Sequence, residues 1–351
     1  MNFRLISKKP PDVISILSFV IFFILSCDST ESIQPLEQNK VDPFIQNKKI
    51  AKTINLGNAL DAPNEGEWGV TLEAEYFQII KSAGFSGVRL PVRWSNHTQA
   101  NSPFTIDENF FKRVDWAVQN ALDNDLAIVI NIHHFEEIFS DPLAFKQKLL
   151  SLWEQIALHF KDYPDDIIFE MLNEPHQKLT SEIWNEFIAE GISLIRKIDD
   201  KRTLMIGPSN WNSINSLNTL EIPNDENLII TVHYYSPFEF THQGASWVED
   251  SDRWMGTTWD ATNTQKELID KDIAIVREWG IRNNRPIFIG EFGAYSKADF
   301  NSRFRWTEYM VQVMQKNEIS WSYWEFCSGF GAWDQQTKKW NELLYALIQP
   351  N

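Results

Sequence analysis

The sequence predicts a (β/α)8 barrel that forms a single domain. From about residue 41 onward, short β-rich runs alternate with helical patterns, and eight such runs can be counted. Eight parallel strands in about 300 residues suit a closed barrel, whereas a doubly wound sheet usually has fewer strands and a glycine-rich phosphate turn after the first strand. No such turn follows the first run.

The N-terminal segment precedes the barrel pattern and has the features of an export signal. Arg4, Lys8 and Lys9 come before an apolar stretch, residues 13–25, that is too short for a comfortable membrane span. Its end at Cys27 resembles the lipobox of bacterial lipoproteins, although Leu25 stands where a small residue is commoner. We therefore expect a signal peptide at residues 1–26, a polar tether at 27–44 after an acylated Cys27, and the folded domain at 45–351.

The eight β-rich runs and the helices between them follow in order. The predicted strands are residues 53–57, 87–91, 127–132, 167–172, 203–207, 228–233, 286–290 and 319–323. Predicted helices include residues 109–124, 143–160, 181–198 and 264–280, of which the second starts with a strong Asp-Pro signal. The longest connection, residues 234–260, is rich in aromatic residues, which favours a cleft wall over a simple linker.

Composition narrows the class of partner. The formal net charge is −16, which opposes nucleic acid and other polyanions and suits a neutral substrate. The chain has 15 Trp, more than a core needs, and amphipathic rings of this kind contact sugars well. Its 2 Cys cannot build a disulfide framework, and we expect Cys327 to be a free thiol.

Polar residues follow nearly every predicted strand. Active sites of such barrels lie at the carboxyl ends of the strands, so these residues should meet. In strand order they are Asn58, Arg89, His133 with His134, Asn173 with Glu174, Asn210 with Trp211, His233 with Tyr235, Glu291, and Trp324 with Glu325.

Glu174 and Glu291 are the candidate catalytic pair. Glycoside cleavage needs one carboxylic acid to protonate the leaving oxygen and one carboxylate to attack the anomeric carbon or activate water. Strands four and seven lie across the barrel mouth, which allows separations of about 5 to 9 Å and so both the retaining and the inverting mechanism. Arg89 and Tyr235 are expected to favour the anion of Glu291.

Several motifs in one order resemble glycoside hydrolase family 5. They are Val88-Arg89-Leu90-Pro91, Ile132-His133-His134, Leu172-Asn173-Glu174-Pro175, His233-Tyr234-Tyr235, Ile289-Gly290-Glu291-Phe292-Gly293 and Tyr323-Trp324-Glu325-Phe326. Asn58-Ala59-Leu60 and residues 240–247 are similar to a bacterial endoglucanase branch of that family. The resemblance covers residues 50–330 and implies a metal-free, retaining double displacement.

The resemblance also implies a role for each motif residue. Glu174 would be the acid/base and Glu291 the nucleophile, with Arg89 and Tyr235 orienting Glu291. Asn173 would hold the sugar 2-hydroxyl, and Trp324 would be the sugar platform at the minus-one position. The remaining predicted site residues are Asn58, His133, His134 and His233 around the cleaved bond, and Trp211, His242, Trp247 and Glu325 further along the cleft. Asp61 stands where the resemblance leads us to expect glutamate.

No cofactor or metal is expected. Adjacent residues of a strand face opposite sides, so His133 and His134 should not form a chelating pair. No His-x-His motif follows the first strand, as a metal-dependent barrel hydrolase would have.

The predicted activity is endo-hydrolysis of a neutral polysaccharide by a monomer. Cellulose-type or mixed-linkage β-1,4-glucan is favoured, and β-mannan and xyloglucan are the competing substrates. A transglycosylase would use the same residues, and a non-catalytic glycan-binding lipoprotein would have replaced one carboxylate. We expect no nucleic-acid partner and contact with a membrane only through the lipid anchor, in the envelope of a bacterium, at its outer membrane. If the lipobox is not used, we expect secretion.

Overall fold

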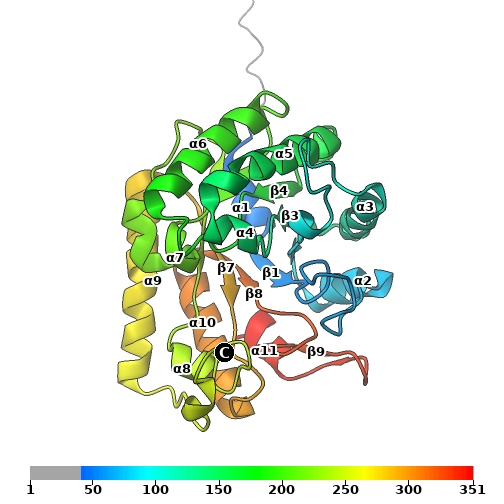
Figure 1. Ribbon diagram of the computed structural model, residues 1–351. Helices are drawn as coiled ribbons and strands as arrows, with labels where there is room; N and C mark the ends of the chain where they lie inside the picture. Colours follow the sequence, from blue (N-terminus) through cyan, green and yellow to red (C-terminus); the bar gives the residue numbers. More distant parts are fainter. Residues whose placement is uncertain (1–40, 351) are drawn as a thin grey trace, which may run out of the picture. The chain divides into compact units, whose positions relative to one another are not determined.

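The computed structural model describes residues 41–350, and its centre is a closed barrel of parallel strands (Figure 1). The barrel strands are β1 Lys52–Asn55, β2 Gly87–Leu90, β3 Ala127–Asn131, β4 Ile167–Glu170, β5 Leu204–Ile206, β6 Leu228–His233, β7 Ile287–Phe292 and β8 Ser320–Tyr323. Each strand pairs with the next along the chain, and β8 pairs with β1. The predicted (β/α)8 barrel is confirmed: β6 has the predicted bounds, and the ends of the other strands lie within two residues of the predicted ones.

Helices surround the barrel and supply most of the connections between strands (Figure 1). They are α1 Pro43–Lys49, α2 Ala74–Ala83, α3 Glu108–Asp123, α4 Glu136–Ser140, α5 Pro142–Phe160, α6 Ser181–Arg196, α7 Ser209–Asn212, α8 Phe238–Thr241, α9 Asn263–Asn283, α10 Phe300–Lys316 and α11 Leu343–Ile348. The four helices predicted from the pattern correspond to α3, α5, α6 and α9. Asp141 begins α5 as predicted, because its carboxylate accepts the backbone N–H of Ala144.

Short elements complete the chain. Within residues 41–350, three 3-10 helices lie at η1 Trp94–Asn96, η2 Ile214–Thr219 and η3 Ser251–Trp254, and β9 Trp333–Asp334 pairs with β10 Lys339–Trp340. The long aromatic connection after β6 is not featureless, because it contains α8 and η3. Among the described residues, no helix is long and apolar enough to cross a membrane.

Helix α1 corrects the predicted start of the folded domain. The sequence predicts residues 43 and 44 as part of the tether, but they form the first turn of α1, where the Asp42 carboxylate accepts the N–H of Phe44. Asn47 donates to the carbonyl of Ile287 and accepts from the hydroxyl of Ser320, at the starts of β7 and β8. The helix therefore closes the amino end of the barrel. The sequence around α1 is short and hydrophilic and lacks a helical apolar pattern. The only sign of a helix there is the Asp-Pro start.

Two hydrophobic clusters lie on the two sides of the barrel wall. The larger one packs the strands against the surrounding helices, and the smaller one fills the barrel interior with Ile50, Ala127, Val129, Ile168, Met205, Ile229 and Phe288. Side chains alternate along a strand, so Glu170 lies on the same face as Ile168. Toward the carboxyl end, the interior therefore changes from apolar to polar, and buried Asn55, Arg89 and Glu170 underlie the site.

Candidate active site

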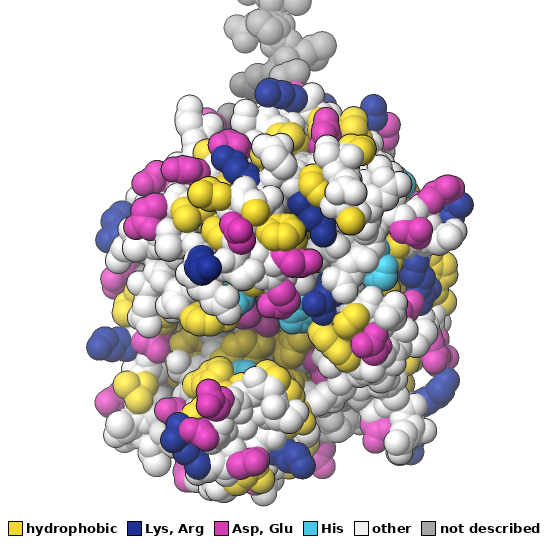
Figure 2. Space-filling view, viewed as in Figure 1, with side chains coloured by type: hydrophobic (Ala, Val, Ile, Leu, Met, Phe, Trp, Pro, Cys, Tyr) yellow, Lys and Arg dark blue, Asp and Glu magenta, His cyan; other side chains and the backbone are white. Residues whose placement is uncertain are grey.

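A cleft crosses the carboxyl end of the barrel. Figure 2 shows it as a hollow between the α7 and α8 segments, with hydrophobic and histidine side chains in it. Two cavities, of about 680 and 740 Å³, make up the cleft, and both are lined by Glu174, Tyr235, His242 and Trp247. The predicted carboxylate Glu174 thus lies between two open lobes.

The two predicted catalytic carboxylates face each other across the cleft floor. Oxygen atoms of Glu174 and Glu291 lie within 4.8 Å of each other, with a His233 nitrogen inside the same limit. Glu174 follows β4, and Glu291 is in β7. A pair this close leaves no room for a water molecule between the sugar and the second carboxylate, which favours direct attack by that carboxylate.

Glu291 is held by a cation and a phenol. Nη1 of Arg89 donates to Oε1 at 2.8 Å, and the Tyr235 hydroxyl donates to Oε2 at 2.9 Å. Burial raises the pKa of Glu291 and outweighs the opposing charges of His233 and Arg89, and the nearby Glu174 adds to the rise. Burial and the two carboxylates also raise the pKa of Tyr235, so this phenol remains a donor. Both hydrogen bonds fix which oxygen of Glu291 points toward the substrate.

Glu174 is bound to a histidine. Nδ1 of His233 lies 2.7 Å from Oε1 of Glu174 and 3.6 Å from Oε2 of Glu291. Burial favours neutral Glu174, but the hydrogen bond and charge of His233 outweigh it and lower the pKa of this carboxyl. Burial likewise opposes a charge on His233, but the carboxylates of Glu291 and Glu174 raise its pKa. The two residues therefore share one proton, which either can hold.

The shared proton predicts a bell-shaped pH profile of kcat/KM. Activity needs ionised Glu291, whose pKa is raised from 4.5, so protonation should remove activity on an acid limb above pH 4.5. It also needs the proton of the Glu174–His233 pair, and the pKa of His233 is raised from 6.5, so the alkaline limb should lie above pH 6.5. Initial rates on β-glucan far below KM, from pH 3 to 10, check this. An alkaline limb below pH 6.5 would contradict the shared proton.

Left-handed backbone marks the rim of the cleft. Asn58, His134, Glu174 and Trp211 all have φ between 48° and 63°, although none is glycine. Each such residue costs about 1–3 kcal/mol, and clusters of them occur where function requires a side chain in one direction. All four are predicted site residues at different strand ends.

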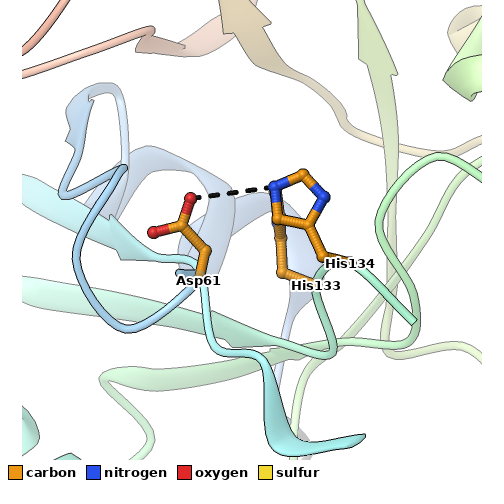
Figure 3. A group of neighbouring side chains, drawn as sticks. All are labelled: Asp61, His133 and His134. Atoms are coloured by element: carbon orange, nitrogen blue, oxygen red, sulfur yellow. Dashed lines mark ion pairs between the residues drawn. The ribbon is translucent and has the colours of Figure 1, made fainter. Parts of the chain in front are cut away.

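The two histidines after β3 lie side by side, which corrects the sequence argument about them (Figure 3). Their ring centroids are 4.5 Å apart, because β3 ends at Asn131 and His134 has a φ of 49°. Strand alternation does not apply beyond the strand. Nε2 of His134 lies 3.9 Å from Oδ2 of buried Asp61, whose pKa burial raises.

The donors of this group suit sugar hydroxyls better than a metal ion. Asn131 accepts the N–H of Val92 through Oδ1, so its amino group faces Nδ1 of His133, which must accept. The ring hydrogen therefore sits on Nε2, where a metal ligand would need a lone pair. Among the described residues, Glu174, His233 and Glu291 form the other close group of this kind, and their hydrogen bonds serve the carboxylate pair. The Nε2–H of His133 is therefore placed to donate to a sugar hydroxyl.

Trp324 forms the floor of the first lobe. Its ring stacks on His133 with centroids 5.9 Å apart, and Asn58, Asp61 and Trp68 line the same lobe. Gly57 lies directly beneath the indole: a Cβ there would be 2.8 Å from Cη2 of Trp324. Glycine is therefore required for the ring to lie flat against the strand end.

Gly57→Ala is expected to raise KM for β-glucan by roughly tenfold, the loss of about 1.4 kcal/mol of sugar contact. The backbone of Gly57 is not left-handed, so alanine fits the chain and only the ring must move. KM and kcat on β-glucan, with the melting temperature as a folding control, measure the effect. An unchanged KM would show that Trp324 is not a platform.

The second lobe carries exposed aromatic rings. Trp211, whose side chain is 51% exposed, stacks on His176 with centroids 4.8 Å apart. Trp247 is 59% exposed and packs edge-on against Tyr295, and His242 stacks on Phe238. Burial lowers the pKa of His242 to about 4, so it is neutral in the cleft at pH 7. Rings on both sides of the carboxylates indicate an extended chain of sugars as the ligand.

Comparisons with known proteins agree with this geometry. Residues 49–329 match the family model described as cellulase (glycosyl hydrolase family 5). The chain belongs to this family. Solved structures of Thermotoga maritima Cel5A, in complex with cellobiose and with mannotriose, are 52% identical over 88% of this chain and 100% of theirs, with a TM-score of 0.86.

Two longer curated proteins are also similar to the chain. Endoglucanase H of Acetivibrio thermocellus is 36% identical over 88% of the chain and 34% of its own length. Cellulase/esterase CelE of the same organism is 31% identical over 79% of the chain and 36% of its own length. The chain therefore spans about a third of the length of these two curated relatives.

Glu325 does not lie in the cleft, contrary to the sequence prediction. It is fully buried, and its two carboxylate oxygens accept the backbone N–H groups of Cys327, Ser328 and Phe330. Burial raises the pKa of Glu325 to about 7, against the lowering effect of these hydrogen bonds. Glu325 thus shapes the loop whose Ser328 and Phe330 line the first lobe. Cys327 is a free thiol, as expected, and it is buried.

Four residues that the structure places in or beside the cleft or beneath it are not predicted from the sequence: Trp68, Asn131, His176 and Glu170. Trp68 lies in the long connection between β1 and α2, where no periodicity points to the cleft. Asn131 and Glu170 are the last residues of β3 and β4. A polar residue at the end of an apolar run indicates a buried polar group that needs a partner, and this pattern is visible in the sequence. His176 follows the Asn-Glu-Pro motif directly and could have been included with it.

Proposed function

We propose that the chain is a retaining endo-β-1,4-glucanase that hydrolyses cellulose-type or mixed-linkage glucan. The observation that carries this is the carboxylate pair within 4.8 Å at the junction of two open lobes. Retention follows from the short separation, and cleavage inside a chain follows from lobes on both sides. The cellobiose complex of the 52% identical relative supports a β-glucan ligand.

The reaction proceeds in two displacements. An oxygen of Glu291 attacks the anomeric carbon while the bond to the glycosidic oxygen breaks, and Glu174 gives its proton to that oxygen. Glu174 then takes a proton from water, whose oxygen attacks the same carbon and releases the Glu291 carboxylate. Asn173 lines the lobe that receives the attacked sugar, which supports its role at the 2-hydroxyl.

A substrate panel tests the proposal. The purified protein is incubated with carboxymethylcellulose, barley β-glucan, glucomannan, galactomannan and xyloglucan, and viscosity, reducing ends and product lengths are followed. Endo-glucanase action should lower the viscosity of a glucan before many reducing ends appear. If the protein releases sugars from the mannans but not from β-glucan, then mannan replaces β-glucan as the proposed substrate. If the folded protein cleaves none of the five polysaccharides, the proposed activity is contradicted.

We also propose that the enzyme is exported, anchored through Cys27 and active as a monomer. Arg4, Lys8, Lys9 and the apolar residues 13–25 support export, but Cys27 lies outside the described residues. One chain supplies every cleft group named above, which supports a monomer. Mass spectrometry of the mature N-terminus checks the anchor: an acylated Cys27 agrees with it, and any other N-terminus contradicts it.

A further inference from the structure

Glu170 is a buried carboxylate to which the proposed reaction assigns no task. It ends β4, and none of its surface is exposed. Oε2 accepts from Nε of Arg89 at 2.6 Å, and Oε1 accepts from Nη2 at 2.8 Å. Burying a carboxylate is costly unless it is paired, so this two-point ion pair needs a reason.

The guanidinium of Arg89 is fully saturated. Its five N–H groups have five acceptors: two oxygens of Glu170, one of Glu291, and the amide oxygens of Asn55 and Asn173. The amino group of Asn55 donates to the carbonyls of Gly290 and Tyr323, which fixes the orientation of its amide. Glu170 thus sets the plane in which Arg89 meets the nucleophile.

The same guanidinium also orients the amide next to the acid/base. Oδ1 of Asn173 accepts from Nη2 of Arg89 at 2.8 Å, which leaves the amino group of Asn173 for the substrate. Moving Arg89 would therefore disturb both Glu291 and the amino group of Asn173. Through Arg89, Glu170 influences the position of both groups.

The charges explain why a second carboxylate is useful. Glu291 is an anion before attack and an uncharged ester after it, so its ion pair with Arg89 is lost in the glycosyl-enzyme. Burial opposes the charge on Arg89, but its ion pairs, first with Glu170 and then with Glu291, raise its pKa. A guanidinium with Glu291 as its sole anionic partner would become an unpaired buried charge at that stage. Glu170 keeps it paired throughout.

We propose that Glu170 is a positioning residue that shares the charge of Arg89, weakening its hold on Glu291 before attack and keeping it paired in the glycosyl-enzyme. The inference rests on the retaining mechanism proposed above. It assigns Glu170 two opposite effects: it speeds attack by Glu291 on the sugar and slows release of Glu291 by water. A residue with only a packing role has no reason to affect the two steps in opposite directions.

Glu170→Gln tests the inference, because it keeps the size but removes the charge and one acceptor. The substrate is 2,4-dinitrophenyl cellobioside, whose leaving group needs little protonation. In the unaltered enzyme, attack should outrun hydrolysis and give a burst of dinitrophenolate close to one per active site. In the variant, kcat/KM should fall roughly 10- to 100-fold, as for other buried partners that orient a reacting group, KM should rise, and the burst should vanish.

The pH profile supplies a second readout. With Arg89 paired to Glu291 alone, the acid limb of kcat/KM should move down by about one to two pH units. The charged or titratable groups that face Glu291 are otherwise unchanged: Arg89 on β2, Glu174 after β4, His233 on β6 and Tyr235 after β6. An unmoved acid limb together with a full burst would overturn the inference.

Two further variants separate charge from stability. Asp199→Asn removes the carboxylate that Arg202 meets at 3.0 Å, a buried pair that also bonds the carbonyl of Ile167 at the opposite end of β4. Asp199→Asn should lower the melting temperature but leave the burst and the acid limb unchanged. A lost burst or a moved acid limb in this variant would overturn the inference. Glu170→Asp keeps the charge. If Glu170→Gln does not fold, Glu170→Asp should retain the acid limb with a reduced kcat/KM, and a limb lowered by a full unit would overturn the inference.

The unaltered enzyme distinguishes this inference from the proposed function. If it releases no dinitrophenolate and forms no covalent intermediate, then the retaining mechanism fails. If it shows a burst that Glu170→Gln also shows in full, with the acid limb unmoved, then the mechanism stands and the role of Glu170 fails.

Discussion

Glu291→Ala is expected to lower kcat on β-glucan on the order of 10⁴- to 10⁶-fold, because no covalent intermediate can form. Arg89 keeps its ion pair with Glu170 in this variant, so the barrel interior stays compensated and the protein should fold. Steady-state rates and the melting temperature measure the two effects. A loss of less than tenfold in a folded protein would show that another group attacks the sugar.

Azide gives this variant a stereochemical readout. Removing the carboxylate leaves a space on the face that Glu291 occupies, and Arg89 and Tyr235 remain to receive a small anion there. Azide should attack the anomeric carbon from that face and give the α-glycosyl azide from dinitrophenyl cellobioside, while Glu174 is still present. The anomeric coupling constant of the product identifies it, and a β-azide would contradict the assignment of the nucleophile.

Glu174→Gln is expected to act selectively. Cleavage of β-glucan should fall about 10²- to 10⁴-fold in kcat/KM, because the leaving sugar oxygen then departs without a proton. The dinitrophenyl glycoside needs no such proton, so its kcat/KM should fall less than about tenfold. Equal losses on the two substrates would contradict the role of Glu174 as the acid.

The histidine partner provides the control for Glu174. Nδ1 of His233 lies 2.7 Å from Glu174 and shares its proton, so Glu174→Gln should also remove the alkaline limb from the pH profile of its residual cleavage of β-glucan. In Glu174→Ala, which vacates the acid position, azide should restore turnover of dinitrophenyl cellobioside with the β-glycosyl azide as product, because that position lies on the other face of the sugar. If the alkaline limb persists in Glu174→Gln, then a group other than the Glu174–His233 pair supplies the proton.

The variants of Glu170, Glu291 and Glu174 should differ in the reaction step that they affect. Glu170→Gln is expected to change the balance of the two displacements, whereas Glu291→Ala abolishes the first and Glu174→Gln impairs proton transfer in both. An equal fall in melting temperature in all three variants, with the burst and the pH profile altered alike, would indicate disrupted packing of the barrel interior instead of three separate roles.

Local sequence determined the strands and the reacting groups of this protein. Most strands appear in the sequence as an apolar run followed by a polar residue, because the interior of the barrel excludes water and its carboxyl end faces water. Glu291 directly follows the predicted strand at residues 286–290, and Glu174 follows the predicted strand at residues 167–172 after a single residue, Asn173. The resemblance to family 5 added the retaining mechanism, which the spacing of strands had left open.

Tertiary structure decided everything that depends on barrel closure. Arg89 meets Glu170 from 81 residues away and Glu291 from 202 residues away, and no local pattern encodes which acceptors surround one guanidinium. The sequence predicts Glu325 as a cleft residue. In the structure, backbone N–H groups of its own loop donate hydrogen bonds to both of its carboxylate oxygens. His133 and His134 become neighbours only because the strand stops before them. Periodicity governs side-chain direction inside a strand, whereas beyond its last residue the backbone is set by contacts with other parts of the chain.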